Sequence, residues 1–131
     1  HIVLSRELTD FGIYPPINIQ NSASRVMGDI ISPEHKLWAR KFKRLNSLLK
    51  ENEVLLRIGA YQKGSDKELD EAIAKKEFMQ KFLGQNPEES FEFEETIRLL
   101  SQIDANVAPN AMQQNINMGS SNATLPNPNL K

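Results

Sequence analysis

The stretch SPEHKLWARKFKRLNSLLKENEVLLRIG, residues 32–59, decides the fold of this chain. Ser32 stands at an expected N-cap, and the proline and glutamate that follow it are typical of the first turn of a helix. Apolar side chains then recur along one helix face: Trp38, Phe42, Leu45, Leu49 and Leu56, widened by Leu37, Leu48 and Leu55. The pattern predicts one continuous helix from residue 33 to about Ile58, closed at Gly59.

Two shorter helices are expected downstream. Ser65 and Glu68 stand at the spacing of a capping box, so the second helix should begin there and end at Gly84. Its apolar stripe comprises Leu69, Ala72, Ile73, Phe78, Met79, Phe82 and Leu83. After a loop, a third helix should begin near Phe93 and carry Ile97, Leu100 and Ile103. Three helices with short connections predict a small bundle over residues 32–104.

The last part of the chain has a different composition. From Ala105 to Leu130 it contains no charged residue, but seven asparagines and three prolines. Such a segment buries too little apolar area to offset the entropy lost on ordering it. We therefore expect residues 105–131 to form a disordered tail.

The segment before the first helix has the pattern of strands and turns. The apolar run over residues 2–4 predicts a buried strand end, and the alternation over residues 17–20 predicts a short strand with one buried face. Between them, two prolines remove backbone donors and favour an extended conformation at Tyr14. A small polar loop then presents Arg25. The character of the sequence then changes at Ser32, where the first predicted helix begins.

Composition excludes several classes of function. Hydrophobic residues make up 39% and charged residues 25% of the 131 residues, which suits one ordinary globular domain. The formal net charge of -1 gives no electrostatic footprint for nucleic acid. The absence of cysteine excludes disulfides and thiolate metal sites, and no apolar run is long enough to predict a membrane span. Because the chain starts within an apolar run and not at a methionine, we expect it to be part of a longer protein.

Few residue patterns indicate catalysis. His1 and His35 have no metal-ligand spacing between them, and Ser22 and Ser24 lack a partner that would activate a nucleophile. The phosphate-binding motif Gly-x-x-x-x-Gly-Lys-[Ser/Thr] does not occur. The chain by itself is therefore not expected to hydrolyse a nucleotide.

Two features leave alternatives open. The acidic group Asp66, Glu68, Asp70 and Glu71 is explained by favourable placement at a helix N-terminus, or else residues 62–71 form a projecting surface that contacts a partner. Arg25 is free to fork onto phosphate oxygens, although an arginine in such a loop is more often an ion-pair partner on the surface. Tyr14 beside two prolines is likewise usually a packing residue.

The chain also carries short motifs in a particular order: IVLSR (2–6), GIYP (12–15), SASRVM (22–27), SPEH (32–35), LRIGAY (56–61), GSDKELDEAI (64–73) and FLGQ (82–85). As an ordered set they resemble the catalytic subunits of rotary ATPases and their type III secretion relatives. The motifs at 58–61 and 64–66 resemble the secretion branch, and within it the flagellar protein-export ATPases. The resemblance covers about residues 1–103.

The resemblance implies a fold and site residues. Residues 1–31 would end a RecA-like α/β nucleotide-binding domain that binds ATP and Mg²⁺, with the metal ligands upstream of this chain. Tyr14 would pack against the adenine ring, and Arg25 would be the arginine finger that reaches the nucleotide of the neighbouring subunit. The second adenine-facing aromatic of the synthases has no matching motif here; Phe91 or Phe93 would replace it, and Phe91 is our candidate.

The resemblance also implies partners and a location. The whole protein would be a homohexamer that powers flagellar or type III protein export at the cytoplasmic face of the inner membrane. The tip over residues 61–71 would meet the coiled-coil stalk protein, and other regions would meet export-apparatus or regulator proteins and export substrates or their chaperones. The alternative is a helical interaction module, or a non-catalytic paralogue, that docks a coiled coil without nucleotide chemistry.

Overall fold

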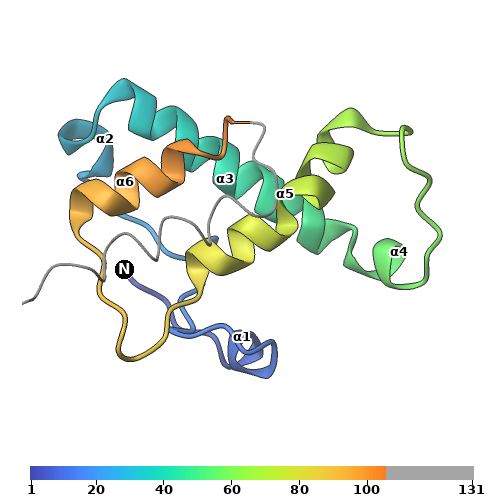
Figure 1. Cartoon of the computed structure of the whole chain (residues 1–131), viewed down its shortest axis with the longest axis horizontal. Helices are drawn as coiled ribbons and strands as arrows, with labels where there is room; N and C mark the ends of the chain where they lie inside the picture. Colours follow the sequence, from blue (N-terminus) through green and yellow to red (C-terminus); the bar gives the residue numbers. More distant parts are fainter. Residues whose placement is uncertain (106–131) are drawn as a thin grey trace, which may run out of the picture.

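The computed structural model describes residues 1–105 and contains six helices within them (Figure 1). Their bounds are α1 Arg6–Asp10, α2 Met27–Ile30, α3 Pro33–Glu51, α4 Glu53–Arg57, α5 Lys67–Leu83 and α6 Phe93–Ser101. The mainly helical fold expected from the sequence is confirmed. The tail predicted over residues 105–131 lies, from residue 106 onward, outside the described residues.

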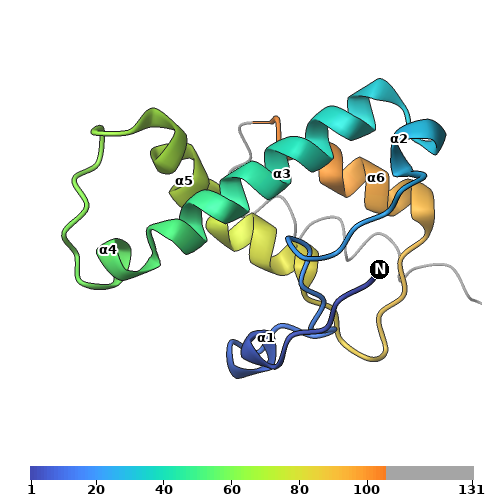
Figure 2. The ribbon, with the colours of Figure 1, turned by 180° about the vertical axis from the view of Figure 1, so that it is seen from behind.

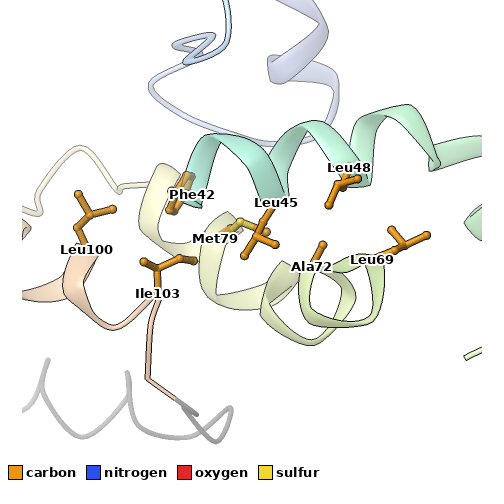
Figure 3. Close-up of a cluster of buried hydrophobic side chains, with 8 residues drawn as sticks. All are labelled: Phe42, Leu45, Leu48, Leu69, Ala72, Met79, Leu100 and Ile103. Carbon is orange, nitrogen blue, oxygen red and sulfur yellow. The ribbon is translucent and has the colours of Figure 1, made fainter. Parts of the chain in front are cut away.

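Helices α3, α5 and α6 enclose the hydrophobic core (Figure 3). The buried side chains come from all three helices and from the turn after α6: Phe42, Leu45, Leu48, Leu69, Ala72, Met79, Leu100 and Ile103. The rings of Phe42 and Phe82 lie 5.2 Å apart at 53°, a tilted contact that joins α3 to α5. Each buried large side chain contributes on the order of 2 kcal/mol by leaving water, so this cluster holds the bundle together.

Two leucines predicted to widen the stripe of the first helix are not in the core. Leu37 is 58% exposed and Leu55 is 37% exposed. Residue 37 is rotated by about 100° around the helix from Trp38, away from the face that contacts α5 and α6. Leu55 lies on α4, beyond a break in the helix.

The predicted continuous helix is interrupted at Asn52, which ends α3 and precedes α4. Asn52 leaves helical geometry, with φ -104° and ψ 12°, and its side-chain amide donates to the carbonyl of Leu48 at 2.9 Å. The Leu48 carbonyl accepts twice, because the backbone N–H of Asn52 also donates to it at 3.1 Å. Such local side-chain bonds favour a departure from helical geometry at asparagine. The predicted closure is present, because Gly59 adopts a φ of 69°, where only glycine is unstrained.

The second helix begins one residue later than the capping box predicts. Asp66, not Ser65, is the N-cap of α5, and its carboxylate accepts from the backbone N–H groups of Glu68 and Leu69 at 2.9 and 3.1 Å. Ser65 instead donates its hydroxyl hydrogen to the carbonyl of Gln62. The side chain of Glu68 does not reach back to the cap, because it pairs with Arg44.

The third helix begins at Phe93 as predicted but ends at Ser101, before Ile103. The chain continues in a turn in which the N–H of Ile103 donates to the carbonyl of Leu100 at 3.0 Å. Ile103 is completely buried although it lies outside the helix. The apolar periodicity therefore identified a core residue without giving its secondary structure.

The two predicted strands are reduced to one antiparallel bridge, between Leu4 and Ile17. The segments lie side by side and exchange single bonds, such as Asn18 N–H to the carbonyl of Val3 at 2.8 Å. A longer ladder does not form because Pro16 has no N–H and because the Asn18 side chain turns the chain at Gln20. The predicted burial of the first strand is wrong within this structure: Ile2 is 76% and Leu4 67% exposed.

The connection between α4 and α5 projects from one end of the molecule in both views (Figures 1 and 2). The N-terminal segment and the loop between α5 and α6 lie at the other end of α5. Helix α5 thus runs from the projecting end to the place where the N-terminal segment meets the bundle.

Candidate functional site

A pocket of about 900 Å³ lies between the turn at residues 12–14, the end of α5, the following loop and α6. Its apolar lining includes Tyr14, Phe82, Phe91 and Leu99. Polar and charged groups complete it: Lys81, Gln85, Asn86, Glu89, Ser90, Glu95 and Thr96. The pocket is open, since Tyr14 is 53% and Phe91 38% exposed.

Backbone contacts hold Tyr14 at the pocket. Gly12, with a φ of 71°, turns the chain back after α1, and the N–H of Ile13 donates to the carbonyl of Leu8 at 3.0 Å. The N–H of Gln85 donates to the carbonyl of Tyr14 at 2.7 Å. This last bond joins the N-terminal segment to the end of α5.

The loop that carries Phe91 is closed by its own hydrogen bonds. The side-chain amide of Gln85 donates to the carbonyl of Glu89 at 2.6 Å, and the Glu89 carboxylate accepts from the N–H of Asn86 at 2.9 Å. Phe93 belongs to a different surface: it is absent from the lining, and its ring lies 6.5 Å from that of His35. Of the two candidate aromatics, the structure brings only Phe91 to the same pocket as Tyr14.

Arg25 lies elsewhere. It is exposed at a bend just before α2 and is not among the residues that line the pocket. Within residues 1–105 its guanidinium makes no ion pair. The structure therefore groups Tyr14 with Phe91 and leaves Arg25 projecting on its own.

Sequence reasoning missed most of the pocket lining. Phe82 was assigned to the core stripe, and Leu99, Lys81 and Glu95 were not singled out. No local motif marks them, because they come together only when α5 and α6 both pack against α3. The one available signal was the FLGQ motif at 82–85, which ends α5 at the pocket.

The acidic residues at the start of α5 have partners within the chain. Asp66 caps the helix, and Asp70 accepts from the hydroxyl of Tyr61 at 2.8 Å and from the N–H of Gly64 at 2.9 Å. The guanidinium of Arg44 donates a bidentate pair of hydrogen bonds to the Glu68 carboxylate, at 3.0 and 2.9 Å. These bonds lower the pKa of Glu68. These contacts fold the tip against α3.

A second group of charges joins α3, α5 and the end of α6. Lys41 lies 2.9 Å from both Glu71 and Asp104, and its hydrogen bond lowers the pKa of Glu71. Lys75 donates to the carbonyls of Ile103 and Ala105, the latter at 3.2 Å. Burial lowers the pKa of Lys75, whose side chain is 13% exposed.

The described residues 1–105 contain neither a candidate metal site nor a candidate membrane span. Over residues 1–105, no three or more His, Cys, Asp or Glu side chains are grouped so that they could hold a metal ion. In the same part of the chain, no helix has the length and apolar character needed to cross a membrane.

Comparisons with known proteins bear on the whole segment. Residues 31–102 match the family model described as the T3SS EscN ATPase C-terminal domain. The chain is 64% identical over 103 residues to the flagellum-specific ATP synthase of Helicobacter pylori strain 26695, an alignment that covers 79% of this chain and 24% of that protein. It is 41% identical over 106 residues to the flagellum-specific ATP synthase of Bacillus subtilis, covering 81% and 24%.

Solved structures agree with these sequence matches. The assembled ATPase EscN from the type III secretion system of enteropathogenic E. coli matches with a TM-score of 0.76 and 40% identity, over 79% of this chain and 25% of that one. EscN in complex with its central stalk EscO matches with a TM-score of 0.74 at the same identity and coverage. The chain thus spans about a quarter of the length of the proteins that it matches.

Proposed function

The chain belongs to the T3SS EscN ATPase C-terminal domain family, and from that premise we propose that it is the C-terminal portion of a hexameric ATPase that energises flagellar or type III protein export. In this proposal residues 1–31 end the nucleotide-binding domain and residues 32–104 form the helical C-terminal domain. ATP and Mg²⁺ would be bound largely by residues upstream. The whole protein would work at the cytoplasmic face of the inner membrane and engage export-apparatus proteins, export substrates or chaperones.

The observation that carries the proposal is the pairing of Tyr14 and Phe91 at one pocket. The two aromatics come from opposite ends of the described chain and are brought together by the backbone bond between Gln85 and Tyr14. An aromatic ring can stack on the face of any nucleobase, and each stacked base contributes about 1–3 kcal/mol to binding. Tyr14 would therefore hold the adenine ring from one side and Phe91 from the other.

The charges of the pocket suit a base better than a triphosphate. Glu89 and Glu95 line it together with a single lysine, Lys81, which already lies 2.8 Å from Glu77. A triphosphate needs cations and backbone N–H groups around its oxygens. In this proposal the phosphates therefore point away from the pocket, toward the upstream part of the protein.

Arg25 would act on the nucleotide of the neighbouring subunit. Its exposure, and the absence of an ion pair within residues 1–105, leave the guanidinium available to a second chain. A guanidinium donated in trans stabilises the negative charge on the phosphoryl group during its transfer. Hydrolysis would then depend on assembly of the ring.

The projecting tip would dock the central stalk. EscN, which this chain resembles in fold and sequence, has been solved in complex with its central stalk EscO. The tip is the part of the helical domain that extends furthest from the core in Figure 1. The alternative of a non-catalytic docking module shares this feature and lacks the nucleotide roles of Tyr14, Phe91 and Arg25.

The test is ATP hydrolysis by the full-length protein carrying Arg25→Ala. Loss of an arginine finger is expected to lower kcat by about 10³-fold or more, while ATP binding and ring assembly are retained. Arg40→Ala is the matched control, because Arg40 is also exposed and lies on the outer face of α3. Equal turnover in wild type and Arg25→Ala would refute the finger, whereas a wild-type protein without ATP hydrolysis would favour the docking module.

A further inference from the structure

We propose that the tip, defined here as residues 52–71, binds a helix whose surface is acidic beside an apolar stripe. The inference rests on the proposed docking of the stalk and adds the chemistry of the surface that would be recognised. It differs from the expectation of an acidic tip, because the structure uses the acids of the tip internally.

Every carboxylate of the tip has a partner within the chain. Glu53 pairs with Arg57, and Glu68 and Glu71 pair with basic side chains of α3. Asp66 and Asp70 accept from backbone N–H groups and from a tyrosine hydroxyl. A carboxylate engaged in this way has part of its charge compensated and fewer acceptor sites left, so it attracts a cation on another protein less strongly.

Two basic side chains of the tip have no ion-pair partner within residues 1–105. Lys63 lies in the loop after α4 and Lys67 is the first residue of α5, and both are exposed. Neither makes an ion pair with any residue in the described range 1–105. The charged side chains of the tip that make no ion pair or hydrogen bond within residues 1–105 are therefore these two lysines.

An apolar edge accompanies these lysines. Val54 is 67% and Ile58 69% exposed, although both are apolar. Val54 lies on α4, and Ile58 is the C-cap of that helix. The N–H of Ile58 donates to the carbonyl of Val54 at 3.1 Å, so both side chains lie on one side of the turn. Leu55, 37% exposed, extends this edge.

The lysines and the apolar edge of the tip indicate which kind of partner surface would bind there. Interfaces combine an apolar centre with a charged rim of opposite sign, and rim charges steer the encounter of the two proteins. A single short helix and a loop offer a narrow ridge, which suits another helix better than a flat surface. The partner should therefore present Asp or Glu residues beside a stripe of apolar residues, as one helix of a coiled coil does.

The experiment measures binding of the full-length ATPase to the stalk coiled-coil protein of the same export system, at two salt concentrations. Lys63→Glu/Lys67→Glu should weaken binding by about tenfold at low salt, mainly through a slower association rate, and the salt dependence should shrink. Ile58→Ser should weaken binding at both salt concentrations. Lys76→Glu is the control, because Lys76 is an exposed lysine of α5 outside the tip.

The outcomes separate this inference from the function on which it rests. If the wild-type protein does not bind the stalk protein, the proposed docking itself is wrong. If it binds, but the double lysine variant binds equally well or more tightly, the acidic character assigned to the partner is wrong. If Ile58→Ser leaves the affinity unchanged, the apolar edge is not part of the interface.

Discussion

The backbone of Tyr14 has a role in the fold, and its side chain has a role in the proposed function. Its carbonyl accepts from the N–H of Gln85, so that the backbone is held while the ring remains half exposed at the pocket. This arrangement separates two roles: the backbone joins segments, and the ring is available to a ligand. A substitution of the side chain should therefore leave the junction intact.

Tyr14→Ala in the full-length protein should weaken ATP binding by about tenfold, because a stacked base loses about 1–3 kcal/mol with its aromatic partner. Tyr14→Phe should bind as the wild type does, since the ring is retained. A titration with a fluorescent ATP analogue gives the three dissociation constants. Identical values would mean that the tyrosine serves only in packing.

Asp66 is a second residue with a defined local task, since it satisfies two amides at the start of α5. Asp66→Ala should destabilise the first turn by about 1 kcal/mol. Hydrogen exchange at the amides of Glu68 and Leu69 should then be about fivefold faster. Ser65→Ala serves as the comparison, because the sequence alone named Ser65 as the cap; an equal effect there would contradict the assignment.

At the scale of elements, the break between α3 and α4 depends on Asn52. Alanine has a higher helix propensity by several tenths of a kcal/mol and lacks the side-chain amide that donates to the carbonyl of Leu48, while its backbone N–H keeps the helical bond. Asn52→Ala should therefore extend α3 into α4, with slower hydrogen exchange at residues 53–55, which now start a new helix. Unchanged exchange there would show that the break has another cause.

Lys75 joins elements that are far apart in the sequence. Its ammonium group serves the carbonyls of Ile103 and Ala105 and lies 3.5 Å from Glu71. Lys75→Met keeps the apolar stem but leaves these acceptors without a donor, which should cost about 1–3 kcal/mol. Urea unfolding, followed by the fluorescence of the single tryptophan, measures the loss. Lys76→Met, at an exposed position, should stay within about 0.5 kcal/mol of the wild type.

At the scale of the whole molecule, the charges between α3 and α5 make stability depend on pH. Hydrogen bonds from Arg44 and Lys41 lower the folded-state pKa of Glu68 and of Glu71. A carboxyl group with a lowered folded pKa stabilises the fold above its unfolded pKa, near 4.5, and this contribution is lost as the pH falls through the folded value.

Thermal unfolding from pH 7 down to pH 3 should therefore show a falling Tm below about pH 5. Lys41→Met should lower the Tm at pH 7 and flatten this decline, because Glu71 and Asp104 lose their common partner. Arg57→Met, which removes a pair on the surface of α4, should change the profile little. An equally steep decline in the Lys41 variant would rule out this network as the source.

Much of the helical architecture could be predicted from the sequence, because periodicity and caps are local signals. The starts of α3 and α6, the end of α5 and the buried state of Ile103 all follow from such patterns. The sequence does not show which residue breaks the first helix or which residue caps α5. Local hydrogen bonds from Asn52 and Asp66 decide these positions, and neighbouring polar residues could form similar bonds.

The pocket was only partly predictable. The motifs identified Tyr14, and the loop position suggested Phe91, but nothing local connects them with Leu99 or Glu95. Their meeting depends on how α6 packs against α3 and on one backbone hydrogen bond between distant segments. The sequence also does not show that basic side chains of α3 pair with carboxylates of the tip, because these ion pairs form only when the helices pack.

Helix α5 is a continuous helix that connects the two ends of the molecule. Its 17 residues form an uninterrupted rod about 25 Å long, with the tip at one end and the bond to Tyr14 just beyond the other. A tilt of this rod cannot be absorbed along its length, since each turn is bonded to the next. A movement of α5 would therefore reach Tyr14 through one backbone hydrogen bond, while Gln20 and Glu7 bond the N-terminal segment separately to α3.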